Sequence, residues 1–338
     1  MTIKEILKTL CLSPSVSGDE AMAGESLRRC LAETGPELKS DALGNFIAVM
    51  NPEGSPRIML EAHLDKIGFI ITGIDEKTGF LRIDKVGGSD ARVCPAQRVS
   101  VFGKRELKGV IISTPPHLAK GDSKKVTPIN ELAIDCGLPF SEIKDIVSLG
   151  DRAMITASFY EMGENIVCAP YLDDSAGAAV LIRAAEILKE KGSKARVELV
   201  FSSREEVGGM GAKTAAFASE AGYGIAVDVS FASAPGVKDE NSAPLGSGAM
   251  IGVSPVLQRK VSDMLKKAAE ENGIPHTIEV LGRSTGTDAD DIVISKSGIL
   301  TGLVSVPIRN MHTPVEIADV TDIESAAKLL AEFTAKID

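Results

Sequence analysis

Histidine and acidic residues follow short apolar runs at several points of this chain. They are His63, Asp173, Glu205, Glu206 and Asp228. Open α/β sheets bind their ligands beyond the carboxyl ends of their strands, so we expect these side chains to meet at one edge. Imidazole nitrogens and carboxylate oxygens are donors that zinc accepts, and one carboxylate shared by two ions would give each ion three protein ligands. A metal site is therefore the first hypothesis.

The first two candidates lie in motifs that also have ordinary structural explanations. The Asp65 carboxylate, two residues after His63, can accept the second N–H of that imidazole, although a histidine after a strand is more often a hydrogen-bonded structural residue. Asp173 and Asp174 open an Ala-rich helix, where a single aspartate would serve as N-cap. Two adjacent carboxylates repel each other unless a cation or a donor lies between them, which favours metal binding.

Glu205 and Glu206 follow a strongly apolar strand-like run and precede a Gly-rich turn. One glutamate of such a pair can ligate a metal while its neighbour acts as general base. The glycines also suggest a nucleotide-binding loop. However, the segment 209–214 lacks both the glycine before lysine of a phosphate loop and the final glycine of a dinucleotide fingerprint, which argues against nucleotide binding.

Asp228 and His312 have alternatives that the sequence leaves open. Asp228 lies inside an otherwise apolar strand, where a buried charge needs a partner. A metal would satisfy it, and so would a buried hydrogen-bond network or a position at the sheet edge. His312 comes after the last apolar strand and is either a ligand or a loop residue.

Seven segments, in this order and spacing, resemble the cytoplasmic metallo-aminopeptidase family of the glutamyl and tetrahedral aminopeptidases, some of whose members carry the name endoglucanase. The segments are 62–69, 115–118, 173–174, 205–208, 227–229, 286–289 and 309–316. The resemblance covers nearly the whole chain. It implies an aminopeptidase that hydrolyses the N-terminal residue from short peptides, with a dinuclear metal-activated water and Glu205 as general base.

The resemblance also implies a set of site residues. Two divalent ions per chain, zinc or cobalt, would be held by one set of three residues, His63, Asp173 and Asp228, and a second set, Asp173, Glu206 and His312. Asp65 would orient His63, and the peptide bond between Asp173 and Asp174 would be cis. The sequence departs from the family pattern at Lys66 and Ser175, two positions that bear on which substrate side chain the enzyme prefers.

The elements that must position these residues alternate between helical and strand patterns at both ends of the chain. The segment 17–20 predicts a capping box before a helix that reaches about Leu31. Between the two ends of the chain, short strand-like pieces separated by Gly and Pro predict a β-rich insert. The predicted fold is an α/β, mixed-sheet zinc-peptidase domain over 1–66 and 166–338, flanked by helices and interrupted by the insert at 67–165.

The insert would leave strand edges that need cover, which predicts a homo-oligomer, and the resemblance implies a dodecamer built from dimers.

The composition of the chain restricts the classes of binding partner that we expect. The formal net charge of -10 argues against nucleic acid and against an anionic membrane surface. The one Lys-rich stretch, 120–125, is interpreted as a solvated loop. The five cysteines form no C-x-x-C pair, and no apolar run is long enough to cross a bilayer, so we expect a cytoplasmic protein.

Three rival functions follow from the same residues. A two-zinc carboxypeptidase or deacylase of this fold needs a cationic clamp for a substrate carboxylate, for which Arg283 and Arg309 are the candidates. An endoglucanase needs an aromatic-lined cleft, which a chain without Trp and with 4% aromatic residues does not favour. A non-catalytic assembly or binding protein would lack a ligand or the base, and this sequence has all of them.

Overall fold

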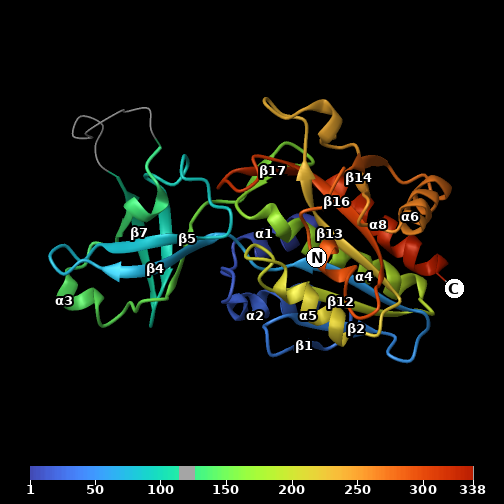
Figure 1. The fold of residues 1–338 in the computed structure, drawn as a ribbon, viewed down its shortest axis with the longest axis horizontal. Helices are drawn as coiled ribbons and strands as arrows, with labels where there is room; N and C mark the ends of the chain where they lie inside the picture. The colour runs from blue at the N-terminus through green and yellow to red at the C-terminus, as the bar shows by residue number, and fades with distance from the viewer. Residues whose placement is uncertain (114–125, 338) are drawn as a thin grey trace.

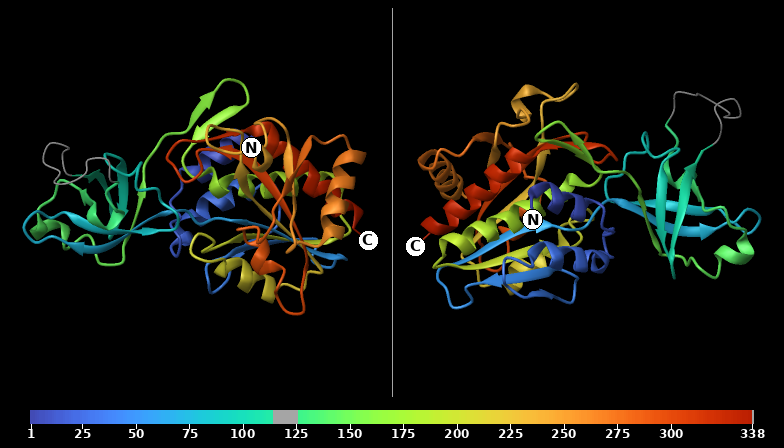
Figure 2. Two further views of the ribbon diagram at one scale, coloured as in Figure 1. Left: turned by 45° about the horizontal axis from the view of Figure 1, so that its top comes forward. Right: turned by 180° about the vertical axis from the view of Figure 1, so that it is seen from behind.

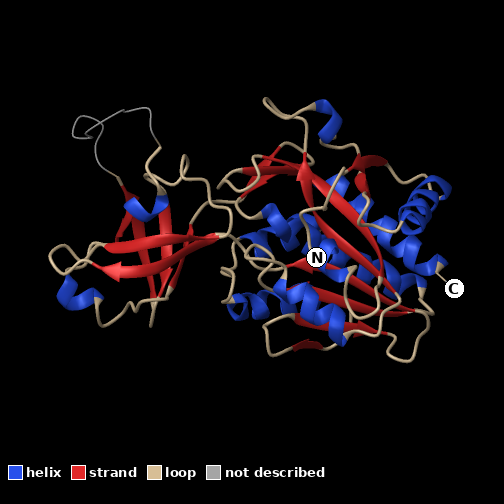
Figure 3. Cartoon of the chain, in the orientation of Figure 1, coloured by secondary structure: helices blue, strands red, loops and turns tan. Residues whose placement is uncertain are grey.

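The computed structural model describes residues 1–113 and 126–337, and its strands form two separate sheets (Figures 1 and 3). The segment 115–118, which contributed to the family resemblance, and the predicted solvated loop at 120–125 lie outside the described residues. The predicted class, an α/β fold with a mixed sheet and a smaller β-rich insert, is confirmed.

The larger sheet has eleven strands within the described part of the chain. They are β1 (Leu38–Ser40), β2 (Phe46–Met50), β3 (Arg57–His63), β10 (Tyr160–Met162), β11 (Ile166–Ala169), β12 (Arg196–Ser202), β13 (Tyr223–Phe231), β14 (Ala249–Val253), β15 (His276–Val280), β16 (Leu300–Arg309) and β17 (Glu316–Asp319). The central strands β12, β3, β13 and β16 are parallel neighbours, and antiparallel pairs flank them. This mixed topology brings the carboxyl ends of the central strands to one edge.

Helices cover both faces of this sheet (Figure 3). One face carries α1 (Ile3–Cys11), α2 (Gly24–Leu31), α4 (Leu172–Lys191), α6 (Arg259–Glu271) and α8 (Val320–Lys336), and the other carries α5 (Met210–Ala218) and α7 (Ala289–Ile292). None of the described helices combines the length and the hydropathy needed to cross a membrane.

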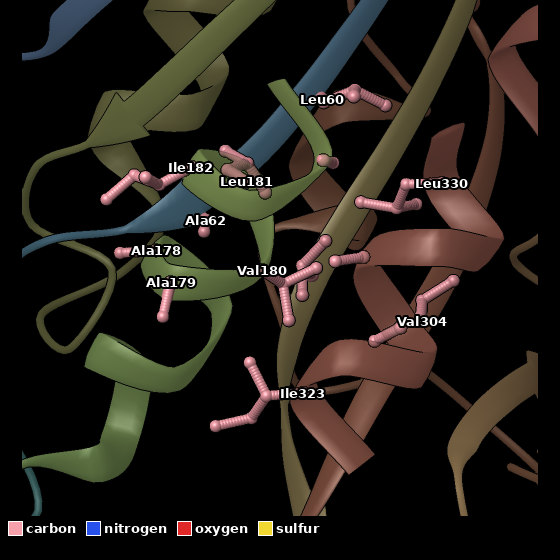
Figure 4. Packing of buried hydrophobic residues seen from close by; sticks show 14 of the residues in the cluster. Leu60, Ala62, Ala178, Ala179, Val180, Leu181, Ile182, Val304, Ile323 and Leu330 are labelled. Carbon is pink, nitrogen blue, oxygen red and sulfur yellow. The ribbon is translucent and has the colours of Figure 1, made fainter. Parts of the chain in front are cut away.

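Strand alternation assigns each side chain of the central strands to one of these two faces. Leu60 and Ala62 of β3 pack in the core beneath α4 and α8, whereas Met59 packs on the side of α5 and α7. Figure 4 shows the first of these cores, in which Val180 and Leu330 belong to α4 and α8. Each such fully buried aliphatic side chain stabilises the fold by about 1.5–3 kcal/mol. The central strands are thereby fixed on both faces.

The insert forms a closed barrel of six strands among the described residues. They are β4 (Gly68–Ile74), β5 (Leu81–Val86), β6 (Arg98–Phe102), β7 (Glu106–Ile112), β8 (Ala133–Asp135) and β9 (Arg152–Ile155), with the short helix α3 (Phe140–Ile143) beside them. The barrel lies to one side of the layered part (Figures 1 and 2). The prediction of strand edges that need cover is therefore wrong for this barrel, because closure pairs its edges. β10, inside the predicted insert range, instead pairs with β11 in the larger sheet.

The N-terminal segment is tied to the end of β3 by a buried lysine. The Lys66 ammonium donates to the main-chain carbonyls of Leu10 and Ser13, each at 2.6 Å, and lies 5.4 Å from the centre of the Tyr171 ring. Lys66 is 2% exposed, and this burial lowers its pKa to about 8. The ammonium group of Lys66 thus serves as a buried hydrogen-bond donor within the fold.

The predicted capping box at 17–20 is wrong. The Ser17 hydroxyl donates to the Asp65 carboxylate at 2.6 Å, and the Glu20 carboxylate accepts from the backbone N–H of Arg204 at 3.2 Å. A short 3₁₀ turn, Glu20–Ala23, precedes α2 instead. Ser17 thus binds the residue that follows β3, and Glu20 binds the segment that carries the paired glutamates, because these tertiary contacts compete with local capping.

Replacing Lys66 by Met should destabilise the protein although the stem volume is nearly kept. Each of the two buried carbonyls that lose their donor costs about 1–3 kcal/mol, so we expect a loss of about 2–6 kcal/mol in the free energy of unfolding. Denaturant titration measures this loss, with the exposed Lys77→Met as matched control. A Lys66→Met value within experimental error of the control would show that the lysine is merely tolerated.

Candidate metal centre

The carboxyl ends of the parallel strands deliver the predicted residues to one cleft of about 700 Å³. His63 ends β3, Glu205 and Glu206 follow β12, and Asp228 lies near the end of β13. β11 runs in the same direction as β16, because both are antiparallel to β17, so the segments that follow them bring Asp173 and His312 to the same edge. All the sequence-predicted candidate ligands, together with Glu205, line this cleft.

Asp173 is the residue that joins the two histidines. Its Oδ1 lies 3.0 Å from His63 Nε2, and its Oδ2 lies 3.1 Å from His312 Nε2. His312 Nε2 is also 3.6 Å from Glu206 Oε1. The peptide bond between Asp173 and Asp174 is cis, as the family resemblance implies. One carboxylate thus faces two imidazoles through its two separate oxygens.

Two groups of donor atoms are close enough to hold one ion each. The first is His63, Asp174 and Asp228, and the second is Asp173, Glu206 and His312, with ligand atoms within 4.8 Å of one another in each group. The first group contains Asp174 in place of Asp173, the residue that the predicted set shares between the two ions. One oxygen of that residue, Oδ1, accepts the N–H of Gly177 at 2.8 Å, and the buried Oδ2 has no hydrogen-bond partner among the described residues.

The electrostatics of the cluster favour cations. Burial raises the pKa of Asp228 and of Asp174 above the ordinary range of a carboxyl, and burial likewise raises the pKa of Glu205 to about 7 and of Glu206 to about 8. Burial opposes ionisation of Asp173 too, but hydrogen bonds from the two histidines hold its pKa below the ordinary range. Carboxylates crowded in this way repel one another, and divalent cations with nitrogen and oxygen ligands would relieve that repulsion. The donor set fits such ions.

Asp65 acts differently from its sequence-based prediction. The Nδ1 of His63 lies 3.0 Å from the main-chain carbonyl oxygen of Asp65 and 3.6 Å from its carboxylate. The carboxylate instead accepts the backbone N–H groups of Glu205 at 2.9 Å and Glu206 at 3.2 Å, as well as the Ser17 hydroxyl. Asp65 is fully buried and positions the turn that carries both glutamates, while its carbonyl orients the imidazole.

Glu316 is a supporting residue that the sequence reasoning missed as a separate part of the site. Its carboxylate accepts the backbone N–H of Asp173 at 3.1 Å and that of His312 at 2.7 Å. It is 1% exposed, and burial raises its pKa to about 8. Its position four residues after His312, at the start of β17, is the one available signal. Without spatial information, that signal does not distinguish a glutamate that holds the backbone of the site from a glutamate on the surface.

Left-handed backbone accompanies the segments that carry the candidate ligands. Tyr171, Arg204, Asn310 and His312 have φ values between 58° and 63°. Non-glycine residues in this region cost about 1–3 kcal/mol each and persist only where the surroundings fix them. The buried carboxylates of Glu316 and Asp65 accept backbone N–H groups from all three of these segments.

A buried pair of carboxyl groups lies beside the candidate ligands, on the side of the sheet that His63 of β3 faces. The Ser202 hydroxyl is 2.7 Å from Glu61 Oε1 and 2.8 Å from Asp288 Oδ2. Burial raises the pKa of Glu61 well above its ordinary range and that of Asp288 to about 6. Asp288 belongs to the segment 286–289 of the family resemblance, and its place here is one of support beneath the cleft.

Comparison with known proteins agrees with this arrangement. The family described as M42 glutamyl aminopeptidase matches residues 44–329. A lysyl aminopeptidase of Pyrococcus furiosus is 35% identical over 96% of this chain and 94% of its own length. The structure of an aminopeptidase from the archaeon Desulfurococcus kamchatkensis is 33% identical, with a TM-score of 0.91 over 99% of this chain and 95% of that one. The TET1 peptidase of Pyrococcus horikoshii, described as assembling into a tetrahedron or a large octahedral shell, is also 33% identical, with a TM-score of 0.88 over 99% and 100%.

Proposed function

The chain belongs to the M42 glutamyl aminopeptidase family, and from this premise we propose that it removes the N-terminal residue from short peptides with the help of two bound metal ions. Membership of the family makes the chain a peptidase. The observation that carries the finer proposal is the position of Asp173, whose two oxygens face His63 and His312 at the base of the cleft.

The residues proposed to hold the metals are those of the predicted sets. His63, Asp173 and Asp228 hold one ion, a set supported by the 3.0 Å between His63 Nε2 and Asp173 Oδ1, and Asp173, Glu206 and His312 hold the other, which matches the second group of donor atoms. The unpartnered oxygen of Asp174, which lies with His63 and Asp228 in the first group, supports a further contact at the first site. Zinc or cobalt suits this mixture of nitrogen and oxygen donors. When bound, the ions supply Lewis acidity that polarises the scissile carbonyl and acidifies the attacking water.

The chain's own residues then move the proton. Glu205 lines the cleft beside the ligands, and burial raises its pKa to about 7, which suits a group that accepts and returns a proton near neutral pH. Its carboxylate takes a proton from the attacking water and delivers it to the leaving nitrogen. Asp65 supports both roles of the paired glutamates, since its carboxylate holds the two consecutive N–H groups.

The substrate end is proposed to be the free N-terminus. A carboxypeptidase or deacylase would need a cationic clamp, and Arg309, one of the two candidates, donates from Nε to the Ser233 carbonyl at 2.9 Å. Arg283 lines the cleft, so it keeps that alternative open to test. Turnover of a free peptide and not of its N-acetylated form supports an aminopeptidase, and cleavage of only the blocked form would overturn it.

The two neighbouring glutamates should fail differently when each is replaced by Gln. Glu205→Gln should retain the bound metal and lose peptide turnover by roughly 10²–10⁴-fold, because an amide of the same shape cannot accept the proton. Glu206→Gln should instead weaken metal binding at one site. Metal content and turnover of free peptide are measured on both variants at saturating zinc or cobalt.

Two outcomes would contradict these roles. Loss of metal from Glu205→Gln with full retention by Glu206→Gln would mean that the roles are reversed. Turnover near the wild-type rate in Glu205→Gln would exclude it as the base.

The chain is further proposed to work as a homo-oligomer in the cytoplasm, with short peptides as its partners. The assemblies named for the TET1 peptidase support oligomerisation, and the barrel of β4 to β9, which lies to one side of the layered part, supports an assembly role for the proposed insert at 67–165 (Figure 2). The five cysteines, all within the described residues, are unpaired, which suits a reducing compartment.

Static light scattering at micromolar concentration tests the assembly. We expect a mass that is a multiple of the 35.5 kDa chain, up to a dodecamer. A variant from which the barrel is replaced by a short linker should fall to a smaller assembly. A single-chain mass for the unmodified protein would contradict the proposal.

A further inference from the structure

A buried carboxylate in the cleft has no part in the proposed mechanism. Glu279 lies in β15 and is 8% exposed, whereas its neighbours Ile278 and Val280 on the opposite face of the strand are 44% and 65% exposed. Its Oε1 accepts a hydrogen bond from the Ser230 hydroxyl, and its Oε2 accepts one from the Ser305 hydroxyl at 3.0 Å. Glu279 and both serines line the cleft, so this carboxylate borders the space that a substrate would enter.

Glu279 lacks the partner that a buried charge normally has. Among the residues that the structure describes, no Lys, Arg or His forms an ion pair with it, and its hydrogen-bond donors are the two neutral hydroxyls. Burying a carboxylate is costly unless a cation compensates for the lost water. A cation that arrives from the cleft would supply that compensation.

The position of Glu279 relative to the centre is fixed by strand register. Asp228 and Ser230 are two residues apart and therefore face the same side of β13, and Ser305 of β16 is the register partner of Asp228. Through its two serines, Glu279 thus lies beside the proposed metal ligand Asp228, further along the same face. The carboxylate therefore borders the part of the cleft that adjoins the centre.

The walls between the centre and the cleft rim are partly apolar. Phe231, 48% exposed, lines the cleft together with Leu281 and Met311. An aliphatic stem with a cationic head suits such a path, because lysine and arginine pack their methylene groups on apolar surface and extend the charge beyond it. The cleft thus offers contacts for both parts of a basic side chain.

We propose that Glu279 selects lysine or arginine as the N-terminal residue of the substrate. This inference rests on the proposed aminopeptidase function and adds the side-chain class to it. The opposite preference, for an acidic residue, would have to rely on Arg283, which also lines the cleft. Arg283 is exposed on the loop after β15, where water and salt screen its charge, whereas Glu279 is desolvated and therefore acts more strongly on a bound charge.

Turnover of Lys-, Met- and Glu-p-nitroanilide by the metal-loaded enzyme tests the selection. The wild type should have its highest kcat/KM with Lys and its lowest with Glu. Glu279→Gln should lower the value for Lys by about 100-fold, as expected when one partner of a buried charge pair is removed, and change that for Met by less than about threefold. Glu76→Gln, an exposed glutamate in the hairpin between β4 and β5, is the matched control and should change none of the three.

Several outcomes would overturn the assignment. An equal loss for all three substrates in Glu279→Gln would mean that this carboxylate holds the substrate amine or the fold. A wild-type preference for Glu that Arg283→Gln abolishes would assign the selection to the arginine. Activity on Met with no preference for Lys would leave the aminopeptidase function intact and refute the selection.

A binding measurement tests the selection of a basic side chain without depending on turnover. Calorimetric titration of the wild type with free lysine and with norleucine, which has the same stem without the ammonium group, requires no catalysis and no folded variant. Tighter binding of lysine by at least about tenfold supports the selection even if no p-nitroanilide is cleaved, an outcome that would count against the proposed function alone. Equal binding of the two amino acids would overturn the inference.

Discussion

The Asp173 carboxylate lies between two imidazoles inside the protein, and the surrounding structure keeps it there. Its oxygens face His63 and His312, which come from segments more than a hundred residues away on either side. Burial alone would favour the neutral acid, and the two imidazoles reverse that preference. Burial raises the pKa of the neighbouring Glu206 and Asp228 carboxyls even though His63 favours their charged forms, and divalent cations between these carboxylates would relieve their mutual repulsion.

The supports of this arrangement come from several parts of the chain. Glu316 binds the backbone of both Asp173 and His312, and Asp65 binds the backbone of both glutamates that follow β12. The barrel also contributes, since Gly88, which follows β5, lies with its carbonyl oxygen 3.2 Å from the Nδ1 of His312. The centre therefore depends on the sheet edge, on the N-terminal segment through Ser17, and on the link to the insert.

Sequence patterns predicted the sheet and the convergence of the candidate ligands because apolar runs mark strands and the residues after them share an edge. His63 lies at the carboxyl end of β3, as expected for a residue that follows an apolar run. The patterns could not predict barrel closure, which depends on pairings such as that of β4 with β9, far apart in sequence. Nor could they assign Ser17, Glu20 and Glu316, because a polar side chain whose hydrogen-bond partner is distant in the sequence has no local period. Asp65 shows the same limit, since spacing predicted its contact with His63 but not the two N–H groups that its carboxylate binds.

The dual contact of Asp173 is tested most directly by metal analysis of Asp173→Ala, purified without chelators and dialysed against zinc or cobalt beside the wild type. Asp263→Ala, which removes an exposed carboxylate from α6, is the control. The wild type and the control should each hold about two equivalents per chain, and Asp173→Ala should hold close to none, because both ions lose a shared ligand. Retention of one full equivalent would limit Asp173 to a single ion, and retention of two would contradict its place between them.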